Sequence, residues 1–299
     1  METRAGRGSL WRPERNRRGS RGSLETLGHE VIVANAREAK WITASDRKND
    51  RVDAKKLALL AHGKVQLLSP VEHRTAEQQA ELSVIRARDA LVRCRTLLVN
   101  LARSVAKGFG HRLPATITAT FGRRALALIP ETLKPALEGL LEQIDALGRA
   151  MDGYDRRIAA VAERHPEVKR LASVPGVGTL SALTFVLTLG RADRFQHSRD
   201  VAGYLGLRPK QHQSGGRDPA LGISKSGDPY MRKLLVQCAH HILGHWGRDS
   251  ALRQWGLSKS GGGKSATKRA IVAVARKLAV LLHRLWVTGE VFKPFPKMA

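Results

Sequence analysis

The sequence contains little cysteine, few aromatic residues and half as much acid as base. Its 299 residues include two cysteines, 5% aromatic residues, and 26 Asp and Glu against 52 Lys and Arg, so the formal net charge is +26. Cys94 and Cys238 stand apart without CxxC spacing, which argues against a disulfide framework or a cysteine zinc site. A charge excess of this size repels itself unless a polyanion neutralises it, and nucleic acid is the polyanion that we expect.

Long apolar runs are also missing. No stretch of about 18 apolar residues occurs, which argues against a membrane span. The basic N-terminus lacks the apolar stretch of a signal peptide, so we expect a cytoplasmic, nucleoid-associated protein without a membrane partner. The hydrophobic share of 42% is nevertheless large enough for real cores.

Four segments follow from the patterning. Residues 1–22 hold seven arginines among Gly, Ser and Pro, which predicts a disordered basic arm that is either a nucleic-acid tail or a stretch translated from an upstream start. We expect an α/β remnant over 23–70, a helical coiled-coil region over 71–165 and a helical C-terminal domain over 166–299.

The second segment contains a predicted strand and a pair of carboxylates. HEVIVAN (29–35) is a β-branched run of strand type, and residues 36–62 are compatible with helix. A lone strand cannot satisfy its own backbone groups, so a sheet here needs partners. Asp50 and Asp53, three apart on a helix, share a face and could hold one divalent cation, although a helix cap is the simpler interpretation of that spacing.

Two helices dominate the third segment. Apolar residues recur every seven positions over 84–105, and the next helix alternates spacings of four and three, which is typical of a coiled-coil seam. These helices could pair with each other as an antiparallel hairpin or with a second chain. The apolar positions of this second helix are Leu133, Leu137, Leu140, Ile144, Leu147, Met151, Tyr154, Ile158 and Val161.

A glycine turn opens the last segment. Gly176, Val177 and Gly178 lie between two apolar helical stretches, and the second helix begins with unpaired N–H groups and a positive dipole end. This arrangement fits a helix-hairpin-helix element that holds a phosphate, or an ordinary αα-hairpin with glycine at its turn.

A Gly-rich basic loop follows this hairpin. Ser214 lies among Lys210, Arg217 and Lys225, where a serine could attack phosphorus or only hydrogen-bond to phosphate oxygens. His241 and His245 are four apart, a spacing that zinc can use, but no third ligand is evident, so we expect packing or phosphate contact instead.

The motifs together resemble one family. LGHEVIVAN and KNDRVDAKKLALLAHG resemble the end of a RuvC-like (RNase H-type) domain, and VPGVGTLSALTFVLTLG, YLGLRPKQHQSGG, LGISKSGDPYMRKLLVQCAHHILG and KRAIVAVARKLAVLLHRLWVTGE resemble the rest of the DEDD-type, Piv/MooV-like transposases of bacterial insertion sequences, the insertion-sequence one-hundred-ten family. The resemblance covers about residues 23–292. It implies a mainly α protein with an RNase H-like α/β remnant.

The resemblance also implies a chemistry. Asp50 and Asp53 fall on the last two acidic residues of the family's Mg²⁺-holding tetrad, and Ser214 falls on the serine regarded as its nucleophile. Two protomers, as a homodimer or tetramer through the coiled coil, would build a composite site that cuts and rejoins DNA. A structured guide RNA from the element directs some members.

The sequence departs from the family at its start. The strands that carry the family's first aspartate and its glutamate are absent, and the arginine-rich arm stands in their place. We therefore expect a transposase truncated at its N-terminus and impaired in catalysis. The alternative is a non-catalytic DNA or RNA binder that inhibits intact transposase through mixed dimers.

Overall fold

The computed structural model describes residues 24, 26–33, 50–63, 74–113, 120–211, 213 and 221–295. The chain divides into two compact units, Met1–Arg74 and Thr75–Ala299. The described residues are mainly helical, as the sequence predicts, and they form no named strand. None of the described helices is long and apolar enough to cross a membrane.

The first unit contains helix α3, Asp50–Gly63. Residues 29–33, the described part of the predicted strand, form no strand there, and 34–35 lie outside the described residues. A β-branched run becomes a strand only when a neighbour takes up its hydrogen bonds, and no described segment does so. The RNase H-like remnant therefore stays a prediction.

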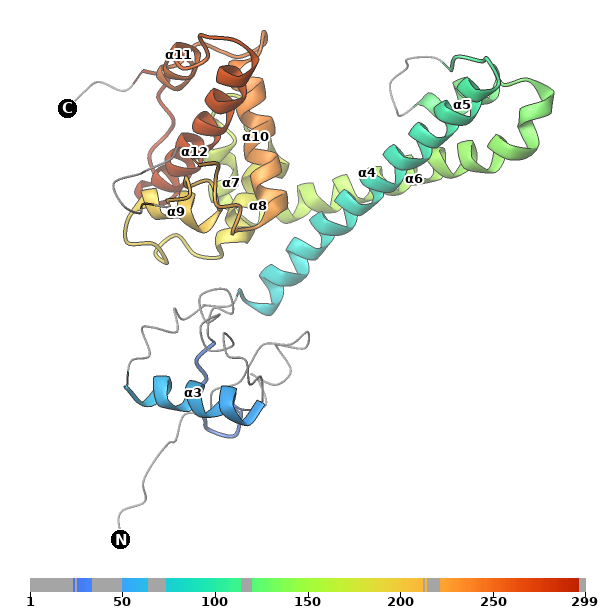
Figure 1. Ribbon diagram of the computed structural model, residues 1–299. Helices are drawn as coiled ribbons and strands as arrows, with labels where there is room; N and C mark the ends of the chain where they lie inside the picture. Colours follow the sequence, from blue (N-terminus) through green and yellow to red (C-terminus); the bar gives the residue numbers. More distant parts are fainter. Residues whose placement is uncertain are drawn as a thin grey trace. The chain divides into compact units, whose positions relative to one another are not determined.

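The second unit holds the remaining helices (Figure 1). They are α4 (Ala76–Gly108), α5 (Phe121–Leu126), the 3₁₀ turn η3 (Glu131–Leu133), α6 (Lys134–Glu163), α7 (Pro166–Leu171), α8 (Thr179–Leu189), α9 (Ser198–Tyr204), α10 (Pro229–Leu243), α11 (Ala251–Ser258) and α12 (Lys264–Thr288). The predicted helix over 76–107 is confirmed, as is the helix that starts next to Pro135. Proline is tolerated there because a first-turn N–H has no helical partner.

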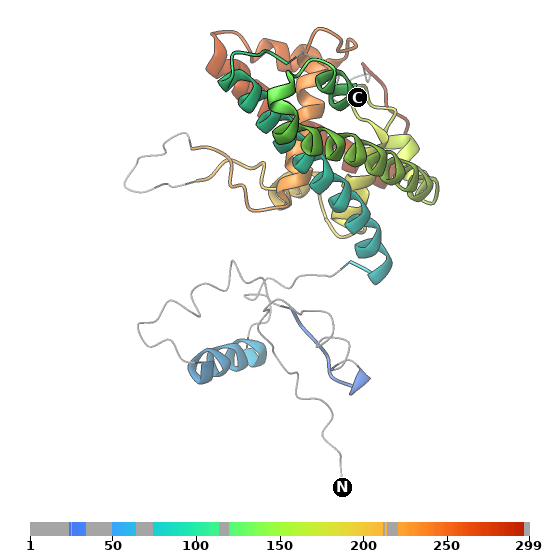
Figure 2. The same cartoon turned by 90° about the vertical axis from the view of Figure 1, so that its right-hand side faces the viewer.

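Helices α4 and α6 form an antiparallel hairpin within the chain. They lie side by side in both views (Figures 1 and 2), and the guanidinium of Arg88 on α4 makes a two-pronged ion pair with Asp155 on α6. Ile144 and Met151 of the predicted seam are buried inside this one chain. The described contacts are therefore those of an antiparallel hairpin within one chain, and pairing of these helices with a second chain stays a prediction.

The seam supplies the apolar core at the outer end of the hairpin. Phe121 and Leu137 are fully buried there, and they belong to one cluster with the buried residues Val99 and Ala102 of α4. Each buried Leu, Ile or Phe contributes about 1.5–3 kcal/mol relative to exposure. The apolar residues of the repeat thus supply contacts that stabilise the hairpin.

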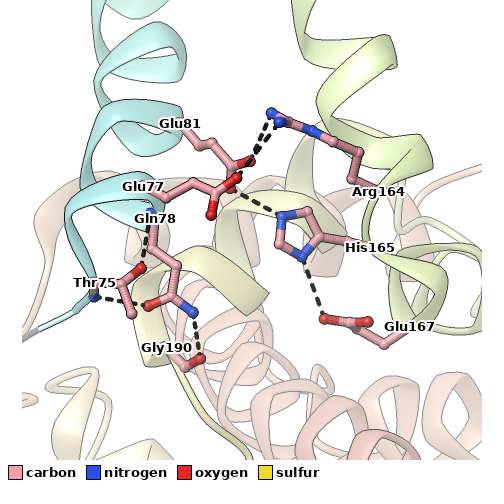
Figure 3. A network of polar contacts seen from close by, with 8 residues as sticks. All are labelled: Thr75, Glu77, Gln78, Glu81, Arg164, His165, Glu167 and Gly190. Carbon is pink, nitrogen blue, oxygen red and sulfur yellow. Dashed lines mark hydrogen bonds and ion pairs between the residues drawn. The ribbon is translucent and has the colours of Figure 1, made fainter.

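A buried carboxylate fastens the hairpin to the following helices (Figure 3). Glu81 on α4 is 6% exposed, accepts a hydrogen bond of 2.7 Å from Arg164 Nη2, and lies 2.9 Å from His165 Nε2. Gln78 Nε2 donates to the carbonyl of Gly190 at the end of α8, at 2.8 Å. One turn of α4 therefore holds the start of α7 and the end of α8.

The remaining helices pack into a bundle around α8 and α12. Residues 182–189 of α8 are all buried, and α12 adds a buried face that includes Val274 and Leu278. Buried His283 on α12 lies 2.9 Å from both the Ser198 hydroxyl and the Ala192 carbonyl oxygen. Burial lowers the pKa of His283, so the ring is neutral and donates to the carbonyl from Nε2.

Candidate nucleic-acid interface

The outer face of α12 carries a one-sided charge. The helix has six Lys and Arg residues and no Asp or Glu over 25 residues. Its first turn contains no acid and begins with Lys264, although the positive end of a helix dipole disfavours cations there. This charge pattern does not stabilise the helix, so it points to a partner outside it.

The cationic face of α12 forms one wall of a groove of about 1300 Å³. The other walls come from α11, from residues 292–294 and from the chain on either side of the loop that contains Ser214. None of the lining residues is acidic. The lining cations are Lys225, Lys268, Arg269, Arg276, Lys277, Arg284 and Lys293.

Few carboxylates compete for these cations. Among the described residues, only Arg284 of the seven lies within 4 Å of a carboxylate, that of the exposed Glu290 at 3.8 Å. Lys277 instead lies over the ring of Trp255, with its Nζ 3.9 Å from the ring centroid. A cation–π contact orders the ammonium without neutralising it. The groove is therefore an electropositive site.

The loop that contains Ser214 has a fixed base. Pro209 and Ile223 form an antiparallel bridge, and the Lys210 N–H donates to the Gly222 carbonyl at 3.0 Å. Leu221 and Ile223 also line the groove. The loop therefore leaves the fold at the edge of the groove.

Glycine is required beside this base. Gly206 has φ +70°, and a Cβ at this position would lie 2.5 Å from the Ser226 nitrogen. The Lys225 N–H donates to the Gly206 carbonyl at 3.0 Å. A side chain at residue 206 would thus push apart the two chain segments that form the base of the loop.

The predicted residues of this loop are only partly described. Ser214 and Arg217 lie outside the described residues. Lys210 and Lys225 are exposed, and Lys225 lines the groove. Both lysines are therefore accessible to a phosphate group, while the role of Ser214 stays a prediction.

The predicted glycine turn joins α7 to α8. Gly176 has φ +86°, and a Cβ there would lie 2.9 Å from Ile242 Cγ1 on α10, so close packing requires glycine. Gly178 is the N-cap of α8 and makes no side-chain cap, whereas Val177 is buried. The turn lines a hollow of about 400 Å³ together with Ser181 and three residues of α10. Both interpretations of the turn, phosphate cradle and packed αα-hairpin, fit this geometry.

The predicted metal ligands are described unequally. Asp53 is 3% exposed on α3, and the side chain of Asp50 lies outside the described residues. Among the described residues, no three His, Cys, Asp or Glu side chains are grouped to hold a metal ion. His245 lies beyond the end of α10 at Leu243, so it does not share a helix face with His241.

Sequence reasoning missed the groove. It used the α12 segment only as a motif of the family resemblance, although this helix lacks acidic residues altogether. That absence, set beside six cations, was the available signal. The other walls come from segments distant in sequence, which no local pattern connects.

Fold and groove together define a basic helical protein whose surface suits a polyanion. The family model described as "Transposase IS116/IS110/IS902 family" matches residues 168–256, which include α8, α9, α10 and the Ser214 loop.

Three relatives extend this similarity over most of the chain. The transposase for insertion sequence element IS1111A of Coxiella burnetii is 31% identical over 82% of this chain and 68% of its own length. The transposase for insertion sequence element IS1328 of Yersinia enterocolitica is 32% identical over 90% and 80%. A probable family 20 transposase of Pseudomonas aeruginosa is 33% identical over 74% and 66%. The chain belongs to the IS116/IS110/IS902 family of insertion-sequence transposases.

Proposed function

We propose that this chain binds the DNA of an insertion sequence along the α12 groove and cuts and rejoins it with Ser214 as nucleophile. One observation carries the proposal: a groove whose described lining has seven cations and no acid has, as one wall, the base of the loop that contains Ser214. A phosphodiester held by those cations lies beside the loop. The family membership of the chain agrees with this activity.

The proposed chemistry is a transfer of one phosphodiester. The Ser214 hydroxyl gives up its proton and attacks phosphorus, and the sugar oxygen leaves with a proton. The serine–DNA ester conserves the bond energy until a second DNA hydroxyl displaces the serine. Lys210, Arg217 and Lys225 would stabilise the charge that develops on the phosphate oxygens. Gly176–Gly178 would hold a more distant phosphate through backbone N–H groups.

Magnesium is part of the proposal through Asp50 and Asp53. Their spacing of three on α3 suits a shared cation, and Mg²⁺ would supply Lewis-acid stabilisation of the phosphate. The described residues add no third ligand, and Asp53 is buried in its unit. The second candidate function is a DNA or RNA binder that inhibits intact transposase through mixed dimers.

We also propose assembly into a homodimer or tetramer, with a structured guide RNA from the element as a second partner. Most of the predicted seam is already buried inside the chain, whereas Leu140, Leu147 and Tyr154 are half-buried. A second copy would therefore need another face, and α4 offers exposed Leu97 and Leu101, one turn apart.

The experiment that tests the function combines joining and binding. The full chain is incubated with Mg²⁺ and DNA that carries the ends of its element, and both joined products and protein–DNA ester are measured. We expect Ser214→Ala to lose both while it keeps DNA binding with a steep salt dependence. Equal products from Ser214→Ala would remove the serine mechanism. Binding without joining by the unmodified chain would support the inhibitor, and no binding would overturn both.

A further inference from the structure

We infer that the α12 groove binds a single strand of DNA, with unpaired bases on its floor and phosphates along its rim. The inference deepens the proposed function and rests on it. It names the form of DNA that this site accepts.

Apolar side chains line the groove together with the seven cations. They belong to Leu252, Trp255, Val280, Leu281 and Phe292, and these five are called the floor here, whereas the cations are called the rim. A duplex hides its bases and presents sugar and phosphate, so these side chains would meet charge and would gain little from the contact. A strand with unstacked bases offers apolar faces together with a charged backbone. The combination of cationic rim and apolar floor fits this ligand.

One cation–π contact connects a rim cation, Lys277, with a floor residue, Trp255. The Trp255 ring lies in the floor, and the Lys277 ammonium lies over it at 3.9 Å from the centroid. The contact holds the long lysine side chain in place before any ligand arrives, which reduces the entropy lost on binding. Aromatic rings with adjacent cations are the usual platform for single strands.

The length of the groove sets the size of the ligand. Its α12 wall runs from Ser265 to Arg284, and a helix rises about 1.5 Å per residue, so this wall is about 28 Å long. An unstacked strand spans more than the stacked spacing of about 3.4 Å per nucleotide, so this wall accommodates at most about eight nucleotides. A probe of twelve nucleotides covers the site.

The choice of DNA over RNA rests on the proposed function. A protein distinguishes RNA by hydrogen bonds to its 2′-hydroxyl groups. Ser265 is the one uncharged polar side chain among the described lining residues. The lysines and arginines can donate to a 2′-hydroxyl but bind phosphate in DNA and RNA alike, and we assign the groove to DNA because the proposed function acts on DNA.

The test compares the full chain with floor and rim variants. Fluorescence anisotropy measures the binding of a labelled twelve-nucleotide deoxythymidine strand, its uridine equivalent, and a twelve-base-pair DNA duplex at one salt concentration. Phe292→Ala and Trp255→Leu remove floor contacts, and Arg276→Gln removes a rim charge. Arg156→Gln, an exposed cation on α6, is the matched control for charge.

We expect the deoxythymidine strand to bind more tightly than the duplex and at least as tightly as the uridine strand. Each floor variant should weaken single-strand binding about tenfold and leave duplex binding unchanged. Arg276→Gln should weaken single-strand binding and lower its salt slope by about 0.7, whereas Arg156→Gln should change neither. Thermal melting checks that Trp255→Leu is folded, and Phe292→Ala decides the matter if it is not.

Three results would overturn the inference: tighter binding of the duplex, tighter binding of the uridine strand, or floor variants that leave single-strand binding unchanged. If strand joining and duplex binding persist in any of these cases, only the single-strand assignment fails. A chain that binds neither form of DNA fails the proposed function itself.

Discussion

The α4–α6 hairpin and the α12 groove use the same residue types in opposite ways. In the hairpin, Arg88 pairs with Asp155, and Arg164 pairs with buried Glu81. In the groove, only Arg284 of the seven cations lies within 4 Å of a described carboxylate, that of Glu290. Charge in the hairpin therefore stabilises the fold, whereas charge in the groove is available to a ligand.

Apolar residues differ in the same way. The hairpin buries its apolar rows against each other, and Phe121 and Leu137 at its outer end are 0% exposed. Val280 and Leu281 on the groove floor are only half-buried. Leu281 also packs against the core of the bundle, whereas, among the described residues, Val280 does not, and apolar surface that stays partly exposed in a groove is typical of binding sites.

The largest expected effect contrasts those two apolar sets. Phe121→Ala should lower the free energy of unfolding by about 3–5 kcal/mol, because it leaves a cavity in the core at the outer end of the hairpin. Val280→Ala should cost less than about 1 kcal/mol, because the side chain fills no closed core. Hydrogen exchange at the amides of α4, α6 and α12 measures both variants. Equal losses would mean that the groove floor is part of the core after all.

The hairpin was predictable because its pattern is local. Spacings of three and four place Ile144 and Met151 on one face of a helix whatever lies elsewhere. Helix α10 begins with a similarly local signal, since Asp228 caps it and its side chain accepts a hydrogen bond from the Met231 N–H. The pattern did not decide between a partner helix in the same chain and one in another. That choice depends on the turn between the helices, which carries no such period.

The groove was not predictable from periodicity. Its described walls come from residues 207–209, 221–225, 251–255, 265–284 and 292–294, and only folding brings them together. The motif around Gly176 was located correctly, yet its positive φ is used for close packing against Ile242. A glycine that a turn needs and a glycine that a phosphate needs look alike in sequence.

The second effect concerns the buried ion pair of the hairpin. Glu81→Gln should lower the free energy of unfolding by about 1–2 kcal/mol at pH 7, because the Arg164 and His165 contacts lose their charged acceptor. Glu77→Gln is the matched control. Its carboxylate lies 3.5 Å from Arg164 but is 74% exposed, so its loss should cost less than about 0.5 kcal/mol. Urea denaturation measures both, and equal effects would show that burial of Glu81 adds nothing.

The smallest effect has the opposite sign. Changing Lys268, Arg276 and Arg284 together to Gln should not destabilise the chain, and it should raise the melting temperature slightly at low salt. These cations are spaced by eight residues on α12, about 12 Å apart, which lies within the screening length of about 30 Å at about 0.01 M salt and exceeds that of about 8 Å at physiological salt. The gain therefore comes from repulsion among the groove cations that is felt at low salt, and it should disappear as salt is added. If the triple variant were less stable than the unmodified chain, the groove cations would hold the fold together, and the contrast with the hairpin would fail.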